Sequence, residues 1–132
     1  MSGRSCPCGL PAAYEECCGR LHSGRAAAET AEQLMRSRFS AFAVGDAAYL
    51  LRSWHPSTRP AEVTFEPFLR WKKLTIVSTS GGGAGDAEGT VEFRARYSQA
   101  GRAGEMRETS RFTRHEGAWV YLMGEARSSR AR

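Results

Sequence analysis

The four cysteines of this 132-residue chain all lie in one short segment near its N-terminus. They form two groups, Cys6-Pro7-Cys8 and, after eight further residues, Cys17-Cys18. Thiolate sulfur is a soft ligand that prefers zinc or iron to calcium or magnesium, and four thiolates complete a tetrahedral site. Cys6, Cys8, Cys17 and Cys18 are therefore predicted to bind one metal ion, zinc or alternatively iron.

Disulfide bonds are the alternative use of these thiols. The neighbours Cys17 and Cys18 rarely bond to each other, and a bond from Cys6 to Cys8 would strain the ring around Pro7, but crossed pairs between the two groups are geometrically open. The first five residues are polar and unlike an apolar export signal, so we expect a cytoplasmic chain with reduced thiols. In that compartment a local cysteine cluster is more often a metal site than a disulfide frame.

A site of four thiolates leaves no open position for water or substrate, so the predicted metal is structural. It would fold residues 1–24 into a knuckle that has too few apolar residues for a core of its own. Gly9 and Gly19 follow the first and last ligands and are expected to supply positive φ. His22 is close enough in sequence to replace a ligand, but a linker or outer-shell role explains it more simply.

Composition and charge indicate one ordinary globular domain with a small appendage. Hydrophobic residues make up 41% of the chain and charged residues 25%, and no apolar run is long enough to span a bilayer. The formal net charge is +5, which permits contact with nucleic acid or the ribosome. The arginines are scattered, however, and bound thiolates would lower this charge. The basic cluster at residues 127–132 is predicted to be a disordered tail.

Residues 25–126 are expected to form an α+β domain. Thr30 and Gln33 form a capping box for a helix that ends before Gly45, and Asp46 can cap a second, shorter helix. The spacing of four apolar residues predicts one buried stripe on the longer helix: Met35, Phe39, Phe42 and Ala43. Strands are predicted at residues 71–78, 90–98, 105–115 and 118–123, with turns at residues 101–104 and 116–117. Helices followed by antiparallel strands predict a curved sheet packed on helices.

The cysteine segment resembles the SEC-C motif, a metal-binding knuckle that also occurs at the C-terminus of the SecA translocation ATPase. Cys6-Pro7-Cys8-Gly9 and Tyr14-Glu15-Glu16-Cys17-Cys18-Gly19 match its ligand pattern without a gap. Leu10-Pro11 and Ala12-Ala13 depart from the usual residues between the ligand pairs. The resemblance implies protein partners, namely the ribosome, nascent chains or an export chaperone such as SecB.

The remainder of the chain resembles the YchJ family, which joins this knuckle to a domain similar to nuclear transport factor two. The resemblance is carried by residues 34–42, by Trp54-His55-Pro56-Ser57-Thr58-Arg59-Pro60, by residues 89–97 and by Ser110-Arg111-Phe112. It implies a cone of bent antiparallel sheet closed by helices. It implies little about activity, because this cone serves enzymes, ligand-binding proteins and adaptors alike.

A pocket inside the cone is the second candidate site. His55 lies where the helices give way to the strands and could act as a general base, with Glu108 as a partner. The pocket residues that we expect are His55, Trp71, Arg94, Glu108, Ser110 and Tyr121. The aromatic residues of the strands could instead pack in the core, as such residues usually do. Arg94 could instead form a cross-strand ion pair on a solvated face.

Two functions are consistent with these patterns. The first is a metal-binding adaptor that presents the knuckle to a protein partner, linked to export or to the ribosome. The second is a small enzyme or ligand-binding protein that uses the cavity of the cone, with His55 as acid or base. The sequence contains no nucleophile triad, phosphate-binding loop or dinucleotide fingerprint, so an adaptor is the preferred interpretation.

Overall fold

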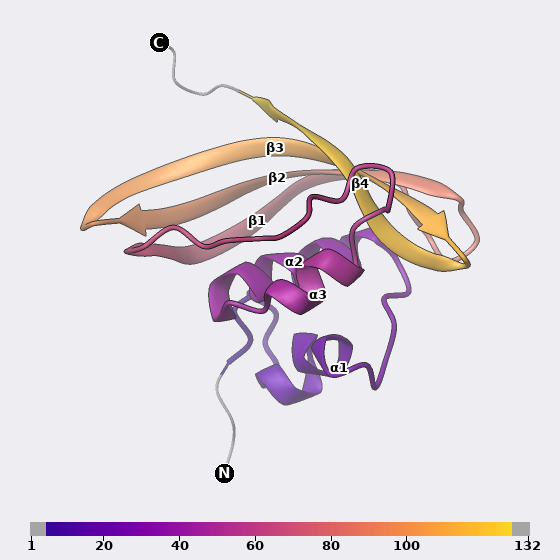
Figure 1. Ribbon diagram of the computed structural model, residues 1–132, viewed down its shortest axis with the longest axis horizontal. Coiled ribbons are helices and arrows are strands. Elements are labelled where there is room, and N and C mark those ends of the chain that lie inside the picture. The colour runs from indigo at the N-terminus through magenta and orange to yellow at the C-terminus, as the bar shows by residue number, and fades with distance from the viewer. Residues whose placement is uncertain (1–4, 128–132) are drawn as a thin grey trace.

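A computed structural model describes residues 5–127 of the chain. Its helical elements are η1 (Tyr14–Glu16), α1 (Cys18–His22), α2 (Ala31–Val44) and α3 (Ala47–Arg52), and its strands are β1 (Leu69–Gly81), β2 (Glu88–Gln99), β3 (Arg102–His115) and β4 (Ala118–Arg127). The strands form one antiparallel sheet in the order β1-β2-β3-β4, which curves over α2 and α3 (Figure 1). The α+β architecture predicted from the sequence is confirmed.

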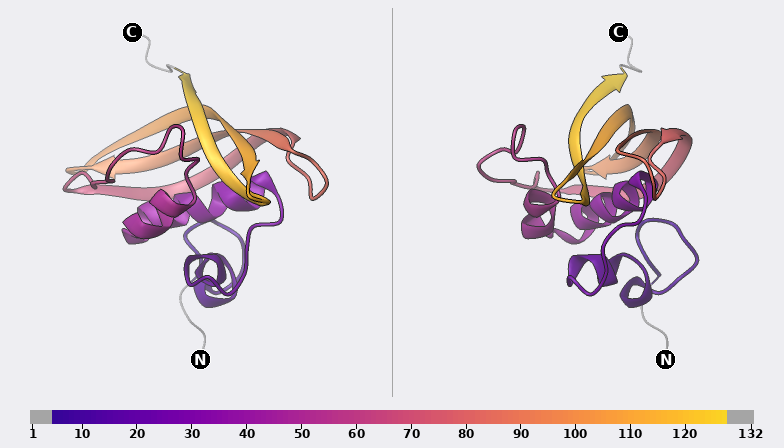
Figure 2. Two further views of the ribbon diagram at one scale, coloured as in Figure 1. Left: turned by 45° about the vertical axis from the view of Figure 1, so that its right-hand side comes forward. Right: turned by 90° about the vertical axis from the view of Figure 1, so that its right-hand side faces the viewer.

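The N-terminal segment lies on the side of the helices away from the sheet. In both views of Figure 2 the strands bend above α2 and α3, while α1 and the segment before it lie below them. The molecule thus has three layers, with α2 in the middle one. No helix within residues 5–127 combines the length and the apolar character needed to cross a membrane.

Helix α2 begins and ends where its capping residues predict. The Thr30 hydroxyl oxygen accepts a hydrogen bond from the Gln33 backbone N–H at 3.0 Å, and Gly45 ends the helix with a φ of 79°. The Gln33 side chain accepts from the backbone N–H of Glu29 at 2.6 Å, one residue earlier than a capping box requires. Asp46 caps α3 as predicted by accepting from the Tyr49 N–H.

The burial of α2 differs from the single stripe predicted for it. Met35 and Phe39 are buried against the sheet, but Ala43 is exposed, and that part of the prediction is wrong. Ser37 and Ser40 are fully buried because the N-terminal segment covers the second face of the helix. An apolar pattern could not reveal this face, since its residues are polar and small.

The hairpin between β2 and β3 is tighter than predicted, whereas the turn at residues 116–117 lies where it was predicted. Ala100 and Gly101 have φ values of 51° and 86°, and Glu116 and Gly117 have 52° and 85°, so both hairpins turn on two residues with positive φ. The predicted turn at residues 101–104 is therefore wrong, and β3 already begins at Arg102. Extra, unpaired residues in β1 (Lys72 and Val77) and in β4 (Leu122) accompany the bend of the sheet.

One face of the sheet forms the core with α2. Val91, Phe93 and Ala95 of β2 are buried, as their alternation predicts, and they pack with Phe112 of β3. Ser53 and His55 pair through their backbones with Tyr121 of β4, at 2.8 Å in each hydrogen bond, which joins the helical layer to the last strand. Arg127, predicted to begin the tail, belongs to β4; the rest of the tail lies outside the described residues.

Removal of the α2 cap should destabilise the domain measurably. We expect Thr30→Ala to lower the free energy of unfolding by about 1 kcal/mol, because the Gln33 N–H loses its acceptor at the helix end. Thr30→Ser keeps the hydroxyl and should stay close to the wild type. Urea denaturation of both variants measures the difference, and equal losses in the two would contradict the capping role.

Candidate metal centre and sheet cavity

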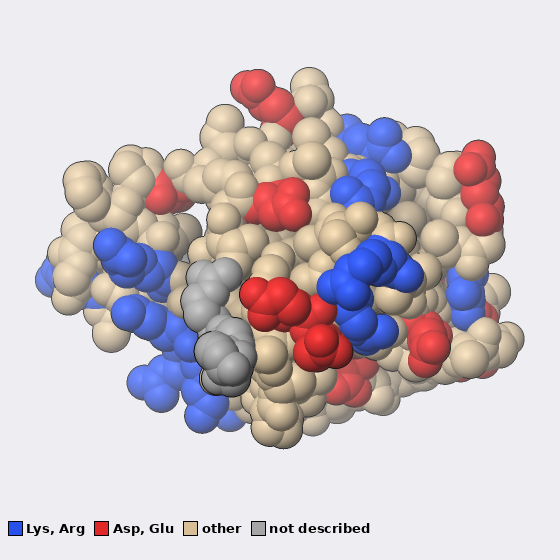
Figure 3. Space-filling model, turned by 90° about the horizontal axis from the view of Figure 1, so that it is seen from below, with Lys and Arg blue, Asp and Glu red and all other residues tan. Residues whose placement is uncertain are grey.

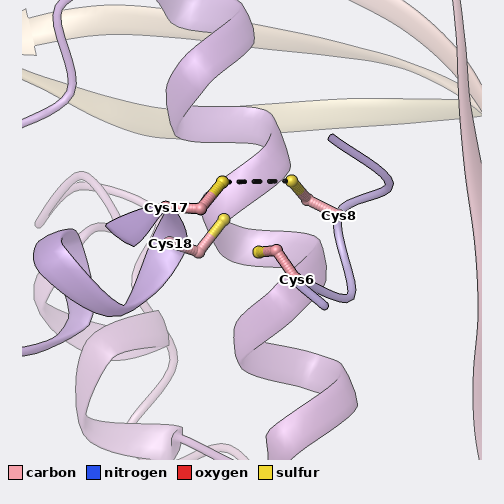
Figure 4. Close-up of side chains that lie close together, drawn as sticks. All are labelled: Cys6, Cys8, Cys17 and Cys18. Atoms are coloured by element: carbon pink, nitrogen blue, oxygen red, sulfur yellow. Dashed lines mark hydrogen bonds between the residues drawn. The ribbon is translucent and has the colours of Figure 1, made fainter. Parts of the chain in front are cut away.

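The four cysteine sulfur atoms come together in one cluster. Their Sγ atoms all lie within 4.8 Å of one another, and Figure 4 shows them turned towards a common centre beside a helix. Cys6, Cys8 and Cys18 are buried, whereas Cys17 is half-buried. The cluster is the one group of potential metal ligands that we find among residues 5–127.

Local backbone structure brings the two cysteine pairs together. A bridge between Ser5 and Ala13 closes a tight loop, in which the Cys6 N–H donates to the Ala12 carbonyl at 2.9 Å. Gly9 turns this loop with a φ of 95°, as predicted. The single turn η1 then leads to Cys17 and Cys18 at the start of α1.

Gly19 is needed for a different reason from the one predicted. It lies inside α1 and does not have a positive φ. A Cβ atom at this position would lie 2.7 Å from the Tyr14 carbonyl oxygen and 3.1 Å from the Tyr14 ring. The glycine therefore permits η1 and α1 to approach closely, which places Cys17 and Cys18 opposite the first pair.

The geometry of the cluster fits a tetrahedral metal ion. With zinc–sulfur bonds of about 2.3 Å, the sulfur atoms of a regular tetrahedron lie about 3.8 Å apart. The Sγ atoms of Cys8 and Cys17 are 3.7 Å apart, and all four thiols are free rather than paired in disulfides. Four sulfur ligands would complete the coordination of such an ion, so its role would be structural.

In the absence of a cation the sulfur atoms share protons. The pKa of Cys8 is lowered to about 5, chiefly by a hydrogen bond from the Cys18 thiol. Burial raises the pKa of Cys17 to about 12, and its hydrogen bonds to Cys6 and Cys8 act in the same direction. The pKa of Cys18 is also raised, first by its hydrogen bond to Cys8 and then by burial. Near neutral pH a metal ion must therefore displace protons from Cys17 and Cys18.

Polar contacts attach the cysteine segment to α2. The Arg36 guanidinium donates to the Cys8 carbonyl at 2.9 Å, and the Ser40 hydroxyl lies 3.6 Å from the Cys6 sulfur. His22 is not part of the sulfur cluster. Its ring nitrogens bond to the Tyr14 hydroxyl at 2.5 Å and to the Ser37 carbonyl at 2.9 Å, so it links the segment to the helix.

A cavity of about 160 Å³ lies on the other side of α2, under the curved sheet. Residues from α2, from the segment after α3 and from all four strands line it: Met35, Arg38, Phe39, Phe42, Trp54, Trp71, Phe93, Ala95, Met106, Glu108, Ser110 and Tyr121. Four predicted pocket residues, Trp71, Glu108, Ser110 and Tyr121, are among them. The sheet thus brings together side chains that are far apart in the sequence.

His55 and Arg94 are not among the lining residues of this cavity. The backbone pairing with Tyr121 turns His55 away, and its Nδ1 lies 2.8 Å from the Ser57 hydroxyl while its ring packs on His115. Arg94 is exposed because strand alternation places it on the opposite face from Phe93. Glu108 lies across from Phe93 and not from an arginine. The predicted pairing of His55 with Glu108 in one catalytic site is therefore wrong.

Arg38 and Trp54 also line the cavity, although neither was predicted to do so. Arg38 is only 4% exposed, and its Nη1 donates to the Leu50 carbonyl at 2.9 Å and to the Ser53 hydroxyl at 2.7 Å. Burial lowers its pKa to about 10, so it stays cationic at neutral pH. Its position one turn before Phe42 and one turn after Leu34 on α2 could have indicated an inward-facing arginine.

Comparison with known proteins gives relatives over nearly the whole chain. A family model described as the middle, NTF2-like domain of YchJ matches residues 30–124. A UPF0225 protein of Streptomyces avermitilis is 60% identical over 121 residues, which cover 92% of this chain and 84% of that protein. A UPF0225 protein of Streptomyces coelicolor is 57% identical over 120 residues, which cover 91% of this chain and 94% of that protein.

Two solved structures share the fold. The solution structure of a SEC-C motif containing protein from Rhodopseudomonas palustris superposes with a TM-score of 0.80 at 31% identity, covering 96% of this chain and 99% of that one. The crystal structure of a SEC-C motif containing protein from Psychrobacter arcticus gives a TM-score of 0.76 at 23% identity, covering 97% of this chain and 85% of that one. The cysteine segment and the sheet domain therefore occur together in other proteins.

Metal binding should depend steeply on pH. Because Cys17 and Cys18 have raised pKa values, at least two protons should leave for each ion bound near pH 7. The apparent association constant should then rise about a hundredfold from pH 6.5 to pH 7.5. Isothermal titration calorimetry with zinc in buffers of different ionisation enthalpy counts these protons. Binding without proton release would contradict the protonation pattern.

Proposed function

Since the chain belongs to the YchJ family (UPF0225) and resembles SEC-C motif proteins in its cysteine cluster, we propose that it is an interaction module built around one structural zinc ion. The observation that carries this proposal is the compact cluster of four sulfur atoms within 4.8 Å. Such a set completes a tetrahedral shell, and a complete shell stabilises a fold and offers no site for a reaction.

Zinc is the metal that we favour. Iron also accepts four thiolates, but zinc binds them without a redox state that must be maintained. The short cysteine segment contributes few apolar residues, and Tyr14 is the one that packs, half-buried, against the cluster. Metal binding would therefore supply the free energy that orders this segment in the cytoplasm, where thiols are reduced.

The outer surface of the cysteine segment would contact the partner. Leu10 is 41% exposed and is followed by the exposed Pro11 and Ala12, because the ligands on either side of this loop point inward. Charged groups of both signs lie on this side of the molecule, which is seen from below in Figure 3. An apolar loop with a charged surround suits a protein partner, since interfaces commonly combine an apolar centre with a polar rim.

The SEC-C resemblance supports partners from protein export or from the ribosome. SecB and the ribosome with its nascent chain are the partners that we propose to test first. Nucleic acid contact through the basic surface is an alternative prediction, and it would show itself as binding that weakens steeply with salt.

Binding can be tested with two matched variants. Leu10 on the knuckle and Val77 on β1 are each 41% exposed, so Leu10→Asp and Val77→Asp introduce the same charge at equal exposure. We expect the zinc-loaded wild-type chain to bind purified SecB or ribosomes, and Leu10→Asp to weaken this binding about tenfold or more, as loss of an apolar contact at an interface does. Val77→Asp should bind like the wild type.

The measurement is surface plasmon resonance against SecB, and co-sedimentation with ribosomes. Zinc-depleted protein should lose binding in both assays. The proposal fails if the zinc-loaded chain binds neither partner, or if the two aspartate variants behave alike.

A further inference from the structure

The cavity under the sheet has the features of a small-molecule site that is separate from the cysteine cluster. Helix α2 lies between the two, so that Ser40 faces Cys6 on one side while Met35, Arg38 and Phe39 face the cavity on the other. A ligand in the cavity would therefore not touch the metal ligands. Ligand binding in the cavity is thus independent of the proposed protein partner.

The size of the cavity limits its occupant to about one ring. Its volume is about 160 Å³. A dry protein cavity of about 150 Å³ lined by apolar side chains binds benzene, whereas drug-sized ligands need about 300 Å³ or more. Most of the wall is aromatic or thioether surface, contributed by Met35, Phe39, Phe42, Trp71, Phe93 and Met106. Such a wall suits the flat apolar body of a ring.

One end of the cavity carries opposite charges close together. The Glu108 carboxylate accepts a hydrogen bond from the Ser110 hydroxyl at 2.8 Å and another from the Tyr121 hydroxyl. The Arg38 guanidinium lies 4.5 Å from the centre of the Tyr121 ring and 4.9 Å from that of Trp54. Since the cation and the carboxylate offset each other, a charged ligand would add an unbalanced charge to a partly buried site. A neutral ligand has no such cost.

The backbone makes room for the carboxylate at this end. A Cβ atom at Gly124 of β4 would lie 2.0 Å from Glu108 Oε2 and 2.9 Å from the Tyr121 hydroxyl oxygen. Glycine at this position thus allows an acidic side chain to lie inside the cone. The polar end of the cavity therefore depends on the backbone of β4 at Gly124 as well as on the Glu108 side chain.

A buried donor at the same end lacks an acceptor. The indole N–H of Trp54 is shielded from solvent, and within residues 5–127 it has no hydrogen-bond partner. A buried donor without an acceptor costs about 1–3 kcal/mol. A ligand oxygen recovers this cost when the indole turns enough to expose its nitrogen to the cavity, because the nitrogen has almost no accessible surface in the present side-chain arrangement. Trp119 differs, because its indole N–H donates to the Glu29 carbonyl at 3.2 Å.

We propose that the cavity binds an uncharged single-ring molecule that carries a hydrogen-bond-accepting oxygen, such as a small aromatic ketone or aldehyde. The ring lies against the aromatic and methionine side chains of α2, β1, β2 and β3. The oxygen accepts the Trp54 indole N–H beside the Arg38 guanidinium. The ligand needs no contact with His55.

The test compares three probes of similar shape on the zinc-loaded full chain. Acetophenone carries a neutral acceptor, ethylbenzene carries none, and benzoate carries a negative charge. With ¹⁵N-labelled tryptophan, the three indole N–H signals of the chain can be followed by NMR during titration. We expect acetophenone to shift the Trp54 signal downfield to saturation and to bind about fivefold or more tightly than ethylbenzene, since one hydrogen bond is gained. Benzoate should bind more weakly than acetophenone.

Two variants identify the donor. In Trp54→Phe, acetophenone and ethylbenzene should bind equally well when measured by ligand-observed NMR. Trp119→Phe, which removes an indole N–H that already has a partner, should keep the preference for acetophenone. The wild-type titration alone can overturn the inference: no saturable shift of the Trp54 signal with acetophenone, equal affinity for ethylbenzene, or tighter binding of benzoate would each contradict it.

Discussion

Four sulfur atoms within 4.8 Å of one another cannot all be ionised unless a cation lies between them. This constraint organises the N-terminal segment. One thiolate, Cys8, is stabilised by hydrogen bonds from the thiols around it, whereas burial and these same hydrogen bonds raise the pKa values of Cys17 and Cys18. A divalent ion would remove this conflict, and this supports the proposal that a metal ion folds the segment.

Helix α2 connects the cysteine segment to the rest of the molecule. One of its faces meets the cysteine segment through Arg36, Ser37 and Ser40, and the other closes the cavity through Arg38 and Phe39. The helix is therefore buried on two sides although it is too polar for a conventional core helix. Order in the metal segment and the shape of the cavity both depend on the position of this one element.

The sequence was most informative where local chemistry determines the structure. The cysteine spacing identified the ligand cluster, Thr30 and Gly45 fixed the ends of α2, and Glu116-Gly117 fixed a hairpin. The resemblance to YchJ proteins and to the SEC-C motif is confirmed by the family match and by the solved structures.

The sequence was least informative about which side chains face the cavity. His55 seemed to be an interior residue, but its backbone pairs with β4 and turns the ring outward. Arg38 was not predicted to face the cavity, yet the segment after α3 covers it. Both outcomes depend on contacts between distant segments. The helical spacing of Arg38 could have indicated its inward position, but no local pattern indicates the orientation of His55.

The central claim is that all four cysteines bind one ion together. X-ray absorption spectroscopy at the zinc edge, on protein purified from cells without added metal or chelator, measures the ligands directly. The account predicts one zinc ion per chain with four sulfur neighbours at about 2.3 Å. A shell that contains nitrogen or oxygen, or a protein that is well folded at the N-terminus without any metal, would contradict it.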